Sequence, residues 1–224
     1  MKCNIFLNIV YVFVFLLGLY CLYTNNIYYY EPLENVKTVY FLGDSILDHG
    51  KYVHPNDPID MQLKKANPEI RYVMEAKDNS VIEHVYTQIK HIEPQNQDVI
   101  VLSVGGNDIL DLIYKEMKNS SIYSDHTNIR KKLSNIIQLH KNLIDHMRET
   151  TSGRLYVCTI YYPPFKKMMQ FHHLIEIWNE YIINSYLPNV IYMDEICVNK
   201  NDFVDTIEPS SICVQKMARY MKSI

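Results

Sequence analysis

The chain has 224 residues, of which 48% are hydrophobic, and its formal net charge at pH 7 is -3. A chain of this length can bury a core large enough for one α/β domain. The small negative charge offers no basic surface to a phosphate backbone, so we expect no nucleic-acid partner.

The first expected element, residues 5–23, is an almost continuous apolar run in which Asn8 is the strongly polar residue. Its length is close to the roughly 20 residues with which a helix crosses a bilayer. Lys2 precedes the run, whereas Glu31 and Glu34 follow it before the next cation. The positive-inside rule therefore predicts a cytosolic N-terminus and an exported domain.

This pattern favours a single-pass membrane protein that an uncleaved signal-anchor holds in the lipid bilayer. The alternatives are a cleaved signal peptide, after which the domain would be secreted, and a buried helix of the domain. The long apolar core and the lack of a small-x-small cleavage site favour the anchor. The expected organisation is a cytosolic N-terminus at 1–4, a transmembrane helix at 5–23, a linker at 24–36 and a lumenal or extracellular domain at 37–224.

The domain alternates apolar runs with amphipathic stretches. The runs are rich in Val, Ile and Tyr, as in parallel strands that are buried on both faces, and the stretches carry apolar residues at helical spacing. The expected strands are Val39–Leu42, Ile70–Glu75, Asp98–Val104, Arg154–Tyr161 and Val190–Met193. The expected helices are Ser80–Ile92, Asn128–Met147, Phe171–Tyr186 and Ser210–Met221, the last with Ser210 as its cap.

Strands that alternate with helices imply right-handed crossovers and a three-layer α/β/α sandwich around a five-stranded parallel sheet. In such folds a functional site forms at the carboxyl ends of the strands. Polar or turn-forming segments follow four of the expected strands and precede the last helix, so several of them converge on one edge. These segments are Gly43–Ser45, Lys77–Ser80, Gly105–Asp108, Tyr161–Phe165 and Asp205–Ser210.

The tripeptide Gly43-Asp44-Ser45 places a serine on a Gly-led turn directly after a strand, which is how many hydrolases present a nucleophile. The same tripeptide is also ordinary turn chemistry. Two motifs together resemble the SGNH (GDSL-type) hydrolases, whose fold is flavodoxin-like. Gly43–Asp48 matches the first block of that family and Ser103–Asp108 matches the third, in the family's order. The matched positions beside the serine are Gly43, Asp44, Asp48, Gly106, Asn107 and Asp108.

The resemblance runs from about Val39 to the C-terminus and implies ester hydrolysis through a serine acyl-enzyme. Ser45 would attack the acyl carbon of an ester substrate, either a lipid or an acylated glycan. The oxyanion would be held by the backbone N–H of Ser45, by a second-block N–H at Asn79 and by the side chain of Asn107. The resemblance implies no metal and no organic cofactor.

The second block departs from the family pattern, because Asn79 stands where glycine is usual. Asparagine tolerates a left-handed backbone better than other non-glycine residues, so its N–H can still point toward the site. The alternative is that Asn79 and Ser80 cap the helix that follows.

The fifth block departs more strongly. The family pattern is D-x-x-H, in which histidine is the general base and aspartate orients it, whereas this chain has Asp205 and then Glu208. A glutamate with the ordinary pKa of about 4.3 is a poor base for a serine hydroxyl, although burial could raise that pKa. The stretch Ile207–Ser210 looks like a recurrent feature of a subgroup of the family.

Three accounts of the missing histidine stay open. Glu208 is the base or hydrogen-bond partner of Ser45, a histidine such as His49 or one of His172-His173 reaches the serine, or the chain is a weak or inactive enzyme with a ligand pocket. The corresponding functions are a membrane-anchored esterase or acylhydrolase and a non-catalytic binding module. A nucleotide-binding protein of flavodoxin-like fold is disfavoured, because no Gly-rich phosphate loop opens the first helix.

The cysteines of the domain are Cys158, Cys197 and Cys213. Their spacing matches no common metal site, and their apolar contexts predict buried core thiols. Whether two of them pair in a disulfide stays open.

Overall fold

The computed structural model describes residues 36–118 and 126–222, which belong to the compact unit Leu33–Ile224. The predicted signal-anchor at 5–23 lies outside the described residues. Within the described residues, no helix combines the length and the apolar character needed to cross a membrane.

The described residues contain one five-stranded sheet in which every pairing is parallel, and all five predicted strands are present. The strand order is β2-β1-β3-β4-β5, the flavodoxin-like order that the resemblance implied. The strands are β1 (Thr38–Gly43), β2 (Arg71–Met74), β3 (Val99–Ser103), β4 (Arg154–Cys158) and β5 (Val190–Ile191). β1 and β3 are buried along their whole length, as their continuous apolar sequences predicted.

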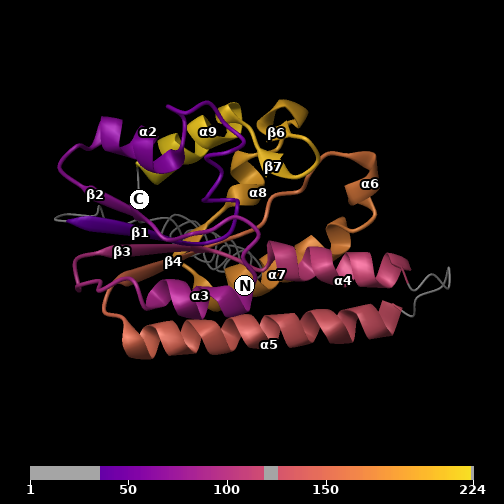
Figure 1. Cartoon of the computed structure of the whole chain (residues 1–224). Helices are drawn as coiled ribbons and strands as arrows, with labels where there is room; N and C mark the ends of the chain where they lie inside the picture. The colour runs from indigo at the N-terminus through magenta and orange to yellow at the C-terminus, as the bar shows by residue number, and fades with distance from the viewer. Residues whose placement is uncertain (1–35, 119–125, 223–224) are drawn as a thin grey trace, which may run out of the picture. The chain divides into compact units, whose positions relative to one another are not determined.

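Helices cover both faces of the sheet, which confirms the predicted three-layer sandwich (Figure 1). One face carries α2 (Ile59–Ala66), α8 (Met193–Ile196) and α9 (Ser211–Met221). The other face carries α3 (Ile82–Ile89), α4 (Gly106–Lys118), α5 (His126–Thr150) and α7 (His172–Tyr186). The short helix α6 (Lys166–Met169) follows β4.

The four predicted helices are present with small shifts at their ends, and Ser210 caps α9 because its side chain accepts a hydrogen bond from the Cys213 N–H. The prediction missed α4, whose first turn is the Gly106-Asn107-Asp108 stretch that we interpreted as a loop. Its apolar residues Ile109 and Ile113 are four positions apart and buried, but glycine and asparagine at the start concealed the helix.

A short antiparallel hairpin stands apart from the main sheet. It pairs β6 (Phe203–Val204) with β7 (Glu208–Pro209) and follows the 3-10 helix η2 (Lys200–Asp202). Each of its strands has two residues, so pairing alone holds it weakly. This hairpin carries the departing residue Glu208.

Candidate active site

The turn after β1 is set by a close approach between two strands. Gly43 pairs with Ser103 of β3 and has φ of 121°, a left-handed backbone that favours glycine. A Cβ on Gly43 would lie 1.7 Å from the Ser103 carbonyl oxygen, so a side chain has no room. The Asp44 N–H donates to the same oxygen at 2.9 Å, and the chain turns to present Ser45, which is half-buried.

The Gln88 side chain of α3 stabilises this turn by two hydrogen bonds to the Gly43 backbone. Its Nε2 donates to the Gly43 carbonyl at 2.9 Å and its Oε1 accepts from the Gly43 N–H at 2.7 Å. The side chain is buried, so both hydrogen bonds are shielded from water. The sequence analysis did not single out Gln88. The sequence feature that could have indicated its role is that Gln88 is a polar residue on the apolar face of a predicted helix.

Asp44 braces the turn as a neutral group. Its Oδ1 accepts from the Ile46 N–H at 3.2 Å and from the Ser103 hydroxyl at 3.3 Å. Burial raises the pKa of Asp44 to about 8, so the carboxyl carries its proton at pH 7. The motif residue therefore adds little negative charge beside the serine at neutral pH.

The structure brings Glu208 to Ser45, although the two residues lie far apart in the sequence. Burial raises the pKa of the half-buried Glu208, and a hydrogen bond from the Ser45 hydroxyl opposes that rise. One carboxyl oxygen, Oε2, is buried without a hydrogen-bond partner among the described residues. A partly desolvated carboxyl in contact with a serine hydroxyl is the arrangement expected of a base with its nucleophile.

Three further side chains lie near Glu208; the sequence analysis missed Lys51 and Tyr52 and included Asp78 only within the polar segment Lys77–Ser80. The Tyr52 hydroxyl donates to Asp78 Oδ2 at 3.2 Å, and it lies near enough to Glu208 to lower the pKa of that carboxyl. Lys51 forms an ion pair with Asp78 and lies 4.8 Å from the centroid of the Tyr52 ring. Lys51 and Tyr52 belong to no motif, so only the folded chain shows that they share the site with Glu208.

Two groups in the cleft at Ser45 are available as donors for an oxyanion. Asn107, in the first turn of α4, lines the same cleft as the serine. Its Nδ2 donates to the Ser80 carbonyl at 2.9 Å, which leaves the second N–H of the amide for a ligand. Within the described residues, the backbone N–H of Ser45 has no hydrogen-bond partner.

Asn79 has the left-handed backbone that its place in the second block required, with φ of 63°. The helix-cap alternative is wrong, because α3 begins at Ile82 with Val81 as its N-cap residue. Asn79 is exposed and its side chain donates to Asp78 Oδ2 at 2.9 Å. Its role as an oxyanion donor stays a prediction.

Two other motif carboxylates tie neighbouring segments together. Asp48 Oδ2 accepts from the Asp78 N–H at 2.8 Å, which joins the first polar turn to the second. Asp108 Oδ2 accepts from the Ile82 N–H at 3.1 Å and so links α4 to α3, while burial raises its pKa. Gly106 lines the cleft beside Asn107.

The histidines considered as alternative bases are occupied elsewhere. His49 is fully buried, with Nδ1 donating to the Ile46 carbonyl at 3.0 Å and Nε2 accepting from the Ile59 N–H at 3.2 Å. Burial lowers its pKa, so it stays neutral. His172 contacts the Pro163 carbonyl at 3.0 Å and His173 contacts the Gln170 carbonyl at 3.1 Å.

Asp205 does not take the position that the family's aspartate has beside its histidine. It lies in the exposed turn of the β6–β7 hairpin, with φ of 51°. Among the described residues, its carboxylate makes no hydrogen bond or ion pair with Glu208 or Ser45. Tyr52 contacts Glu208 instead.

An apolar cleft opens beside Ser45, with a volume of about 540 Å³ that includes its part open to solvent. Its polar groups gather at the serine, where Asn107 and the Tyr161 ring also border it. The remaining wall comes from α4 and from the chain between β4 and α7. Its apolar side chains include Ile109, Leu110, Ile113, Ile160, Met168 and Ile175.

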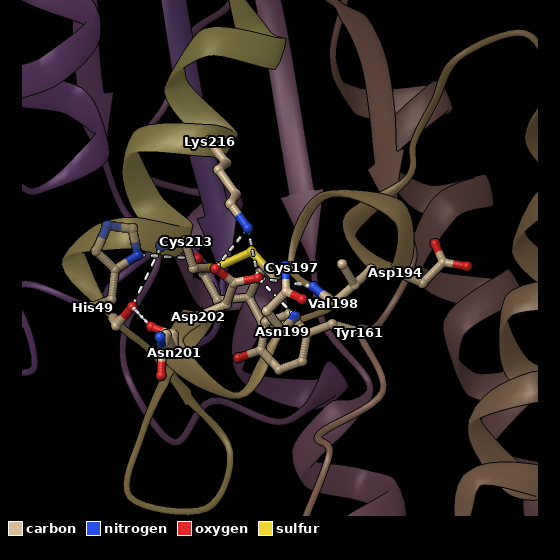
Figure 2. Close-up of a disulfide and its surroundings, with 12 residues drawn as sticks. His49, Tyr161, Asp194, Cys197, Val198, Asn199, Asn201, Asp202, Cys213 and Lys216 are labelled. Carbon is tan, nitrogen blue, oxygen red and sulfur yellow. Dashed lines mark hydrogen bonds and ion pairs between the residues drawn. A yellow bond between two sulfur atoms is a disulfide. The ribbon is translucent and has the colours of Figure 1, made fainter.

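Two of the predicted core thiols are instead a disulfide between Cys197 and Cys213 (Figure 2). Both residues are fully buried, which explains why their apolar contexts suggested core thiols. The prediction is right for Cys158, which is a buried free thiol. No group of three metal-ligating side chains occurs in the described part of the chain.

No family model and no curated protein matches the sequence. Solved structures do match the fold. A lipase from a goat rumen metagenome is 18% identical with a TM-score of 0.62, and the match covers 84% of this chain and 96% of the lipase. A lipolytic protein of the G-D-S-L family from Veillonella parvula is 15% identical with a TM-score of 0.59, covering 84% and 98%.

This chain has the fold of the G-D-S-L (SGNH) lipases and esterases. A variant of an acetyl xylan esterase from Geobacillus stearothermophilus has the same fold, with 13% identity, a TM-score of 0.57 and coverage of 84% and 94%. At these identities the likeness establishes the SGNH fold, while the chemistry of this chain depends on its own residues.

Proposed function

We propose that the chain is a serine ester hydrolase in which Ser45 is the nucleophile and Glu208 is the general base. The observation that carries this proposal is that the fold brings a half-buried Glu208 beside Ser45: the serine hydroxyl lowers the pKa of that carboxyl, and Ile207, which precedes Glu208, lines the same cleft as Ser45. The SGNH fold shared with lipases and esterases supports it.

The reaction needs one proton acceptor and one oxyanion site. As Ser45 Oγ bonds to the acyl carbon, its proton passes to Glu208, and the oxyanion is held by the Ser45 N–H and the Asn107 amide. Glu208 then gives the proton to the departing alcohol oxygen as the ester C–O bond breaks. A water molecule attacks the acyl-enzyme with Glu208 again as base, which releases the carboxylic acid and restores Ser45.

Burial makes this carboxylate a better base than a solvated glutamate. Desolvation raises the pKa of Glu208 above its ordinary value, toward the range in which a base works near neutral pH. Activity should therefore fall as the pH drops through that raised pKa, because protonated Glu208 cannot accept the serine proton.

The cleft supports an apolar acyl group as the part of the substrate that enters beside Ser45. Side chains of α4 and α7 offer aliphatic contacts, and polar atoms are confined to the serine end. We therefore favour a lipid or another ester with an alkyl acyl chain over an acylated glycan. Each buried methylene contributes about 0.8 kcal/mol of binding.

We also propose that residues 5–23 anchor the domain to a membrane, with the domain on the exported side. The apolar run and its flanking charges support the anchor. The Cys197–Cys213 disulfide supports export, because disulfides persist mainly in oxidising compartments.

A non-catalytic binding module is the second candidate. It is favoured by the lack of a histidine at Ser45 and by the buried Glu208 Oε2 without a partner among the described residues. Such a module would hold the same apolar ligand without forming a bond to Ser45.

The test compares wild type with Ser45→Ala on p-nitrophenyl esters of two to twelve acyl carbons. Wild type should turn over, with kcat/KM rising with chain length, and Ser45→Ala should lose about 10³-fold or more. Ser134→Ala, an exposed serine on α5, is the matched control and should keep full activity.

Labelling by a fluorophosphonate separates the two candidates, because it requires an activated serine. Labelling of wild type but not of Ser45→Ala supports the hydrolase. Folded wild type that neither turns over at any pH nor becomes labelled would leave the binding module as the function.

A further inference from the structure

The segment that carries Glu208 is closed at its two ends by the disulfide. Cys197 directly follows α8, and Cys213 lies in the first turn of α9 (Figure 2). Both cysteines are fully buried, so the bond fixes the two ends of the segment to the core. Between them the chain forms η2 and the β6–β7 hairpin.

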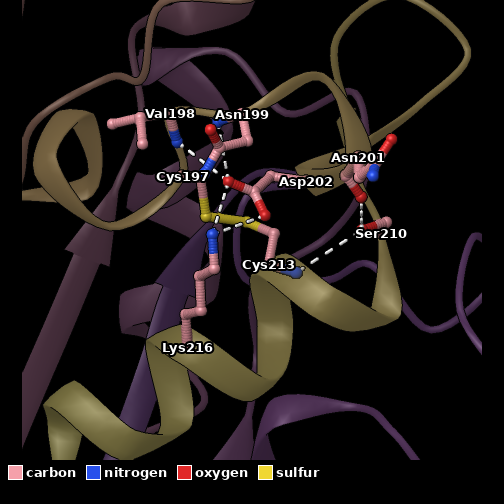
Figure 3. Close-up of polar contacts among 8 residues, drawn as sticks. All are labelled: Cys197, Val198, Asn199, Asn201, Asp202, Ser210, Cys213 and Lys216. Carbon is pink, nitrogen blue, oxygen red and sulfur yellow. Dashed lines mark hydrogen bonds and ion pairs between the residues drawn. A yellow bond between two sulfur atoms is a disulfide. The ribbon is translucent and has the colours of Figure 1, made fainter.

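Inside this closed segment, Asp202 is a buried hub that is only 1% exposed. Its carboxylate accepts from the Val198 N–H at 3.0 Å and from the Asn199 N–H at 2.8 Å (Figure 3). Lys216 of α9 reaches the same carboxylate, with Nζ 2.7 Å from each oxygen. The ion pair therefore joins the segment to the helix one turn beyond the disulfide.

Backbone hydrogen bonds connect Asp202 to the strand that carries Glu208. The Ser210 N–H donates to the Asp202 carbonyl at 2.8 Å, and the Ser210 hydroxyl donates to the Asn201 carbonyl at 2.7 Å. Val204 then pairs with Glu208 across the hairpin. Glu208 is thus held two residues before Ser210 on a strand whose partner begins directly after Asp202.

Tyr161, which lines the cleft, contacts the β6–β7 hairpin at two points. The Tyr161 hydroxyl donates to the Ile207 carbonyl at 2.7 Å, and the Tyr161 ring meets the Phe203 ring edge-on with centroids 5.0 Å apart. The residue that precedes Glu208 is therefore fixed to the chain that lines the acyl side of the site. The hairpin is held from both ends and from its tip.

We propose that the Cys197–Cys213 disulfide and the Asp202–Lys216 ion pair form a clamp that positions the Glu208 carboxylate for proton transfer from Ser45. This inference rests on the proposed function and assigns to the four residues a positioning role, since none of them touches Ser45 in the described contacts. A two-residue hairpin is marginal alone, and a displacement of about 1 Å in a base can cost about 10²-fold in rate.

A positioning role for these four residues and a role limited to stabilising the fold lead to different kinetic results. A brace that only stabilises the fold would change the amount of folded protein and leave kcat per folded molecule intact. A clamp sets the burial and placement of Glu208. Loosening it should lower kcat with little change in KM and should move the acid limb of the pH–rate profile to lower pH, because the carboxyl becomes better solvated.

The experiment uses the full chain with Lys216→Met, with Lys216→Arg as the conservative rescue and with Asp98→Asn as the matched control. Lys216 keeps 33% of its side chain exposed, so methionine fits without burying new polar groups. Asp98 is a buried carboxylate that accepts from the Thr38 N–H at 3.0 Å, at the amino end of the sheet far along the strands from Ser45. The double variant Cys197→Ser/Cys213→Ser removes the disulfide.

Activity is measured per folded molecule on a p-nitrophenyl ester, with folding followed by near-ultraviolet circular dichroism. We expect Lys216→Met to lose about tenfold or more in kcat with KM within about twofold. Lys216→Arg should recover most of the rate. Asp98→Asn should melt earlier but keep the wild-type kcat and acid limb. The double serine variant should show at least the loss of Lys216→Met.

Two results overturn the inference in distinguishable ways. Wild-type kcat and acid limb in folded Lys216→Met refute the clamp while the activity of wild type still supports the hydrolase. An inactive wild type that a fluorophosphonate does not label refutes the proposed function, and the clamp falls with it.

Discussion

In the proposed function, Glu208 takes the role of general base that a histidine has in the resembling family. The surroundings of Glu208 shift the pKa of its carboxyl. Burial raises the pKa of the carboxyl, while the nearby hydroxyls of Ser45 and Tyr52 lower it. The ion pair of Asp78 with Lys51 lies beside it, with Asp78 raising and Lys51 lowering the same pKa.

Tyr52→Phe tests whether the phenol tunes this base. Removing the hydroxyl deletes a hydrogen bond that lowers the pKa of Glu208, so the acid limb of the pH–rate profile should move to higher pH. We expect kcat near neutral pH to fall about 2- to 10-fold, the equivalent of one neutral hydrogen bond. Stopped assays from pH 4 to 9 provide the measurement.

Tyr72→Phe is the matched control, because this tyrosine lies on β2 with its ring stacked on Phe41. Its profile should overlay that of wild type. An acid limb of Tyr52→Phe that stays in place or moves to lower pH would contradict the assigned role.

At the scale of elements, the site depends on how closely β1 and β3 approach. Gly43 has no room for a Cβ and holds a left-handed backbone, so the Gly-led turn is required by the packing of the two strands. Gly105, at the end of β3, is similar, because a Cβ there would lie 2.2 Å from the Trp178 ring. Gly43 therefore lies where two strands meet, and Gly105 lies where α7 packs against the turn after β3.

Gly43→Ala should destabilise the protein by about 3 kcal/mol or more, because the added carbon meets backbone that cannot move without breaking the sheet. Gly50→Ala is the control, since its nearest atom would be a Pro58 side-chain carbon at 3.9 Å. Urea unfolding followed by circular dichroism measures both. If Gly43→Ala and Gly50→Ala have equal urea midpoints, β1 and β3 can move apart with little loss of free energy of unfolding.

The central strands β1 and β3 were predictable because they are buried along their whole length and so read as continuous apolar runs. Helix α4 was not, because Gly106 and Asn107 open it and have low helix propensity. Its N-terminal turn is fixed by tertiary contacts such as the bond from the Ile82 N–H to Asp108. The same turn carries Asn107 to the cleft beside Ser45, so the missed helix also positions the proposed oxyanion donor.

At the scale of the whole molecule, two buried ionisable groups shape how stability depends on pH. Burial lowers the pKa of His140 to about 3 from 6.5, so the unfolded chain binds a proton that the folded chain refuses, and stability falls as the pH drops below 6.5. Burial raises the pKa of Asp44 from 3.8 to about 8, so the folded chain keeps a proton that the unfolded chain loses. The contribution of Asp44 therefore decreases as the pH rises from 4 to 8.

These opposite slopes partly cancel between about pH 4 and 6.5, and above that range His140 no longer offsets the loss due to Asp44. We expect the melting temperature of wild type to decline from pH 6.5 to 8, and Asp44→Asn to flatten that decline because its amide does not titrate. Differential scanning calorimetry across this range checks both. An undiminished slope in Asp44→Asn would assign the decline to other groups.

The sequence by itself determined the five strands, the three-layer sandwich and the position of Ser45 and Asn107 in polar segments after two of the strands. Each of these is encoded locally, in the burial of a run or in the residues of one turn. The tertiary structure decided what surrounds the serine: Glu208 from the hairpin, Tyr52 and Asp78 from two loops, and the buried pair of Asp202 with Lys216. Such contacts join side chains distant in sequence, and their energies exist only after the backbone has brought desolvated groups together.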